Sequence, residues 1–232
     1  MNQYRHIRSF DAVFYSFIAL VLFLFHDIQA PFSFPSLGVF VITVPAVGIA
    51  AATLAIPGDI LLQSSLKERI KMLKLFALAT AGLAPFVSWH INGAASIYLT
   101  LCAGLAFVSG VVYILTLLKI LEEIFTLASR PIYALASKHL RSFSSLAVLT
   151  PTATLYVFII INMLQRQTVP AQAFSQIWNS LHPVIQTALP AAAMIYVGLF
   201  LWMLFKVRGV MTTLYEGYDS EQNRPLENPI TE

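Results

Sequence analysis

The chain has 232 residues, of which 58% are hydrophobic and 11% are charged, and its formal net charge is +3 at pH 7. A water-soluble domain of this length needs far more charged surface, so the composition indicates an integral membrane protein. The positive charge does not require a nucleic-acid partner, because cations of a membrane protein face anionic lipid headgroups. The single cysteine, Cys102, excludes an internal disulfide framework.

Six apolar stretches alternate with polar connectors. Each is close to the ~20 residues that an α-helix needs to cross ~30 Å of hydrocarbon. We therefore predict an all-α, polytopic bundle of six transmembrane helices at residues 10–29, 34–56, 72–91, 94–118, 146–164 and 187–205. The first span is rich in phenylalanine, including Phe14 and Phe17, and we expect it to face lipid. Small residues in the second, third, fourth and sixth spans favour close helix packing there.

The cations are distributed unevenly among the connectors. If the N-terminus lies in the cytoplasm, every Lys and Arg except Arg166 lies on the cytoplasmic side, which is the positive-inside pattern. We therefore expect both termini in the cytoplasm, and we expect a bacterial inner membrane as the location. Residues 1–208 form one predicted transmembrane domain, and residues 209–232 a polar, disordered cytoplasmic tail.

Two cytoplasmic connectors carry helical patterns. Residues 64–74 lack Gly and Pro, so we expect a helix that runs directly into the third span. Residues 119–145 are amphipathic on both sides of Pro131, and we expect them to lie in the inner membrane interface. A soluble protein could also bind 119–145, and we expect the surfaces 64–74 and 119–145 to be the ones that a protein partner uses. The last external loop, 165–186, also predicts a short amphipathic helix.

Histidines gather at the expected outer face, at the ends of spans and in the last loop. Imidazole and carboxylate groups bind transition metals, and two histidines can ligate haem. The candidate metal ligands are His26, Asp27, His90 and His182. The candidate substrate pocket consists of His26, Asp27, Trp89, His90, Asn92 and Arg166. Histidines at a membrane interface are also common without any ligand, so both sites are hypotheses.

The sequence carries few signs of catalysis. It contains no glycine-rich phosphate loop, and no serine nucleophile is paired with a buried base. The leading hypothesis is a non-enzymatic membrane subunit of a larger transport or secretion assembly, without a cofactor. Two alternatives stay open: a self-sufficient small permease or channel with an outward-opening pocket, and a metal- or haem-binding protein that uses the outer histidines.

Overall fold

The computed structural model describes residues 3–29, 35–57, 64–92, 96–150 and 179–222, together with 153, 154, 156, 157, 160 and 161. This described part of the chain is helical throughout, apart from short turns, so the all-α prediction is confirmed for it. The helices are α1 (Gln3–Gln29), α2 (Pro35–Leu54), α3 (Ser64–Asn92), α4 (Ile97–Leu127), α5 (Pro131–Phe143), the π-helical turn η2 (Ser144–Leu149) and α8 (Pro183–Gln222).

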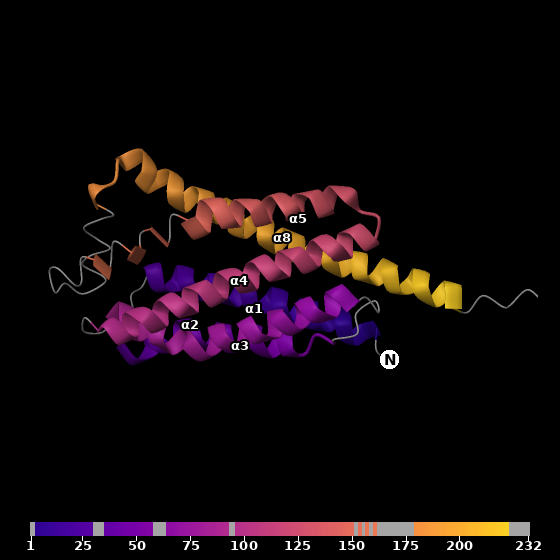
Figure 1. Ribbon diagram of the computed structural model, residues 1–232, viewed down its shortest axis with the longest axis horizontal. Coiled ribbons are helices and arrows are strands. Elements are labelled where there is room, and N and C mark those ends of the chain that lie inside the picture. Colours follow the sequence, from indigo (N-terminus) through magenta and orange to yellow (C-terminus); the bar gives the residue numbers. More distant parts are fainter. Residues whose placement is uncertain are drawn as a thin grey trace, which may run out of the picture.

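Consecutive helices run side by side in opposite directions (Figure 1). Helices α1 to α4 form a close group, α5 packs along α4, and α8 packs against α1 and α4. This arrangement brings the starts of α1, α3 and α5 to the same end as the last turns of α2, α4 and α8 (Figure 1). We call it the charged end, because the ion pairs described below lie there.

Three segments of the described helices are long and apolar enough to cross a membrane. They are Ser65–Val87 in α3, Ile97–Leu127 and Pro183–Leu214 in α8. Ile42–Leu54 of α2 is apolar but shorter. Large apolar side chains on these helices are exposed, including Tyr98 and Ile195 at 65% each. Such surface is unfavourable in water and favourable in lipid, so the helices support a membrane protein.

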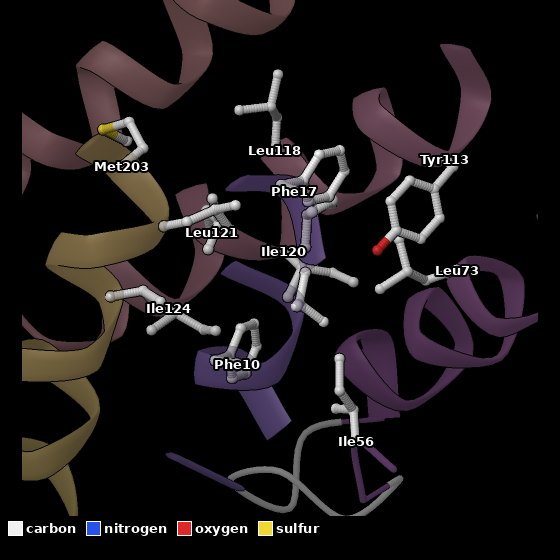
Figure 2. Close-up of a cluster of buried hydrophobic side chains, with 14 of the residues drawn as sticks. Phe10, Phe17, Ile56, Leu73, Tyr113, Leu118, Ile120, Leu121, Ile124 and Met203 are labelled. Carbon is white, nitrogen blue, oxygen red and sulfur yellow. The ribbon is translucent and has the colours of Figure 1, made fainter. Parts of the chain in front are cut away.

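The hydrophobic core lies between α1, α2, α3, α4 and the middle of α8, residues 200–211 (Figure 2). Leu117, Leu118, Leu121 and Ile124 of α4 are each 0% exposed, so one face of this helix is completely covered. The core also includes Phe17 of α1, which is only 8% exposed. Its ring contacts that of Phe200 in α8 at 5.0 Å between centroids. The expectation that the first span faces lipid is therefore wrong at Phe17, because α8 covers this face.

One buried hydrogen bond joins α2 to α4 inside this core. The Thr53 hydroxyl donates to the carbonyl of Ile49, with 2.7 Å between the oxygens. Since that uses its only proton, the Tyr113 hydroxyl is the donor in the 2.9 Å contact between Tyr113 and Thr53. In a membrane the surrounding lipid is as apolar as the core, so the hydrophobic effect does not drive helices together. Hydrogen bonds between helices then contribute to their association.

The connector 64–74 is helical and continues into α3, as predicted. Its apolar side chains Leu66, Ile70 and Leu73 are buried, at 0–1% exposed. The connector therefore binds the rest of the bundle through its apolar face, and it leaves a charged face outside.

The segment 119–145 differs from the prediction. Its break is where we expected it: α4 ends at Leu127 and Pro131 is the first residue of α5. However, α5 turns back and packs lengthwise along α4 (Figure 1). The buried Ser137 hydroxyl donates to the carbonyl of Leu118 at 2.7 Å. The prediction that this segment lies flat in the membrane interface is therefore wrong, since α4 covers the inner face of α5.

The predicted tail is shorter than expected. Helix α8 continues to Gln222, and its residues Val210 and Met211 are buried at 7% and 0% exposed. The expectation of disorder is therefore wrong at the start of the tail, where Val210 and Met211 pack on the core. Residues 223–232 lie outside the described residues, as do 162–178, which hold most of the predicted amphipathic helix in the last loop.

Candidate functional site

His90 of α3 is buried at 6% exposed and contacts α4. Its Nδ1 lies 3.3 Å from the Thr100 hydroxyl, which donates to the carbonyl of Ser96 at 2.9 Å. Because that bond uses the only hydroxyl proton of Thr100, His90 Nδ1–H is the donor toward Thr100. The Tyr156 hydroxyl donates to the Thr100 carbonyl. These contacts give His90 a structural role in joining α3 to α4.

Trp89 precedes His90 and points to a different side of α3. It is 48% exposed, and its ring contacts that of Phe86 at 5.4 Å between centroids. Adjacent helical residues project about 100° apart, so one faces outward when the other faces inward. The structure therefore does not bring these two predicted pocket residues together.

His182 is exposed and immediately precedes α8. Its Nδ1 accepts a hydrogen bond from the backbone N–H of Val184 at 3.3 Å, so the imidazole satisfies a donor at the start of the helix. The side chains of His26, Asp27 and Asn92 and the whole of Arg166 lie outside the described residues. Among residues that the structure does describe, no group of three or more His, Cys, Asp or Glu side chains is placed to hold a metal. The metal, haem and pocket hypotheses stay predictions.

The charged end carries a cluster of ion pairs that sequence reasoning missed. Arg69 of α3 pairs with Glu123 of α4, with 2.8 Å between Nε and Oε1. Glu122 pairs with Lys119 of the same helix and with Arg141 of α5, each at 3.0 Å. Glu122 and Glu123 are only 17% and 20% exposed, which strengthens their attraction to the cations by excluding water. The cluster fastens α3, α4 and α5 together.

A hollow of about 280 Å³ lies beside this cluster, at the turn between α4 and α5. The turn contains Ser129 with φ of 54°, a left-handed conformation that non-glycine residues seldom adopt. The polar and charged groups that line the hollow belong to Glu122, Thr126, Ser129, Arg130 and Lys138. Two large apolar side chains on α5, Ile132 and Leu135, are 78% and 55% exposed beside it.

We call the exposed surface made by Arg130, Ile132, Leu135 and Lys138 the α5 face. Its apolar centre and cationic edges are typical of a protein interface. In the sequence, the signal for this surface was the amphipathic pattern around Pro131. That pattern fits a helix on a membrane surface equally well.

No protein-family model, curated protein or solved structure matches this chain.

Proposed function

We propose that the chain is a six-span protein of the bacterial cytoplasmic membrane, with both termini in the cytoplasm, and that it is the non-enzymatic membrane subunit of a larger assembly. Transport or secretion is the working class of that assembly. The alternating directions of the helices support this topology, because they gather the described ion pairs at one end. Cations at one end of a bundle favour the cytoplasmic side.

The length of α4 supports a surface that projects from the membrane. Its 31 residues span about 46 Å at ~1.5 Å per residue, whereas a bilayer with its headgroups is ~40–45 Å thick. The charged residues Lys119, Glu122 and Glu123 lie in the last third of the helix, so that third is the part outside the hydrocarbon. The α4–α5 turn then extends into the cytoplasm beyond the headgroups.

The 78% exposure of Ile132 is the observation that carries the proposal. With the turn outside the bilayer, this side chain contacts water in the isolated chain, and a partner protein would cover it. The ion-pair cluster keeps α3, α4 and α5 in fixed relative positions, which lowers the entropy lost when a partner binds. The exposed charged side of the connector 64–74 lies at the same end and extends the surface.

The filled core favours a subunit over a self-sufficient channel. Side chains of α4 with 0% exposure occupy the space between α1, α3 and α8 (Figure 2). A solute path through that space would have to displace them.

Purification from native membranes in a mild detergent tests the proposal. We expect a partner chain in a fixed ratio to this protein. The double variant Ile132→Glu/Leu135→Glu should lose the partner and keep its fold, because both side chains are exposed. Val184→Glu is a matched control, since Val184 is 64% exposed at the opposite end of the bundle. A protein that purifies alone, or a partner that the double variant retains, would contradict the proposal.

A further inference from the structure

A second hollow, of about 440 Å³, lies between α5 and α8. From α5 it is lined by Ala136, His139, Leu140 and Phe143, which share one helix face because they are spaced by three or four residues. From α8 it is lined by Ala192, Ile195, Tyr196, Leu199, Trp202 and Met203. We call this hollow the α5–α8 groove. Most of its wall is hydrocarbon.

Aromatic contacts close both ends of the groove. Nearer the charged end, the rings of Tyr133 and Trp202 meet edge to face with 5.6 Å between centroids. At the other end, the rings of Phe143 and Tyr196 stack at 6.0 Å, and the Tyr196 hydroxyl hydrogen-bonds to Ser144. The two helices therefore touch at two points and stay apart between them, where Ala136 supplies little volume.

The groove opens to the outside of the bundle. Ile195 and Leu199 on its wall are 65% and 48% exposed, so it faces lipid when the chain is in a bilayer. An empty apolar hollow loses the dispersion contacts that surrounding atoms would otherwise make. Hydrocarbon from the membrane would restore them.

The length of the groove suits an acyl chain. Tyr133 and Phe143 are separated by ten residues of α5, which is about 15 Å along the helix axis. The hydrocarbon of a bilayer is ~30 Å thick, so about 15 Å is the depth that the acyl chains of one leaflet occupy.

A cationic group lies at the end of the groove that is nearer the charged end. The Lys206 ammonium is 5.9 Å from the centroid of the Trp202 ring. An ammonium group near the surface attracts an anionic headgroup. The groove therefore combines hydrocarbon walls with positive charge at one end, as an anionic phospholipid requires.

We propose that the α5–α8 groove binds one anionic phospholipid of the cytoplasmic leaflet, with an acyl chain between the helices and its phosphate beside Lys206. The proposal rests on the membrane orientation given under the proposed function, and it does not depend on a protein partner. The result of its test is therefore independent of whether a partner protein binds the α5 face.

Quenching of Trp202 by brominated lipid tests the site. The variant Trp89→Phe/Trp178→Phe keeps Trp202 as the only indole and is reconstituted into vesicles of phosphatidylcholine and phosphatidylglycerol. Bromine is carried on the acyl chains of one lipid or the other. We expect brominated phosphatidylglycerol to bind beside Trp202 about five-fold more tightly than brominated phosphatidylcholine, as one lysine near the surface would produce.

Three further variants of the Trp202 reporter separate the headgroup from the chain. Lys206→Gln should remove the preference for phosphatidylglycerol, and Lys74→Gln, at the charged end of α3, should keep it. Ala136→Phe should fill the groove and reduce quenching by both lipids. A reporter with Trp89 alone, which is exposed at the opposite end, should show no preference. Equal quenching of Trp202 by both lipids, or unchanged quenching in Ala136→Phe, would overturn the proposal. So would a Trp202 that neither lipid reaches, since a protein segment would then cover the groove.

Discussion

The group of helices α1 to α4 packs differently from the pair α5 and α8. In the first region, side chains such as Leu121 of α4 are 0% exposed and fill the space between helices. In the second, two aromatic contacts hold the helices apart around a groove, and Leu199 is 48% exposed. Lipid is as apolar as leucine, so hydrophobicity alone does not decide which face is covered. The shape of the side chains and a few polar links decide it.

A leucine-to-alanine pair tests this contrast with the largest expected effect. Leu121→Ala should lower the free energy of unfolding by about 2–5 kcal/mol, because it opens a cavity in a filled core. Leu199→Ala removes the same atoms from a face that lipid can refill, and its cost should stay below about 1 kcal/mol. Equilibrium unfolding in mixed detergent micelles measures both. Equal losses would mean that the two regions do not differ in packing.

The ion-pair cluster should give the next largest effect. Glu122→Gln removes the charge that holds Lys119 and Arg141, each at 3.0 Å, so we expect a loss of about 1–3 kcal/mol. Arg208→Gln is the matched control, because Arg208 is 54% exposed and lies 3.7 Å from Asp11. Its loss should be about 0.5 kcal/mol or less. Unfolding curves at low and high salt test whether the loss comes from the ion pairs. A Glu122 variant as stable as the Arg208 control would show that these pairs do not stabilise the fold.

The hydrogen bond between Tyr113 and Thr53 should give the smallest effect. Tyr113→Phe keeps the ring in the core and removes the donated bond, which should cost about 0.5–1.5 kcal/mol. A double-mutant cycle with Thr53→Val isolates the bond from changes in packing. Tyr15→Phe, at a side chain that is 60% exposed, should be neutral. Additive losses in the cycle would show that the two hydroxyl groups do not interact.

The sequence was informative where a local pattern has one structural meaning. The connector 64–74 contains no helix breaker, and it is part of α3. Pro131 cannot continue the helix before it, and it is the first residue of α5. Long apolar runs predicted membrane helices, and three such segments are present in the described residues.

Patterns with two physical meanings were interpreted less well. The apolar face of an amphipathic segment can lie against lipid or against another helix. In α5 it lies against α4, as the hydrogen bond from Ser137 to the Leu118 carbonyl shows. Phenylalanine is equally stable in lipid and in a core, so composition could not reveal that Phe17 is buried. The polar composition of 209–222 did not show that Val210 and Met211 pack on the bundle.

The candidate sites show the same limit. His90 was singled out as a possible ligand, but its partner Thr100 lies on the next helix, and only the fold shows that pairing. The ion pair between Arg69 and Glu123 joins residues 54 positions apart, so no local spacing could reveal it. The α5–α8 groove likewise depends on how two separate helices cross.

The membrane orientation of the charged end is the central claim, and cysteine labelling tests it most directly. In a Cys102→Ser background, single cysteines at Lys71→Cys, Lys138→Cys, Arg208→Cys or Val184→Cys would be treated with a membrane-impermeant maleimide. Intact cells should label only Val184→Cys, and permeabilised cells should label all four. Labelling of Lys71→Cys and Lys138→Cys from opposite sides of the membrane would contradict the account.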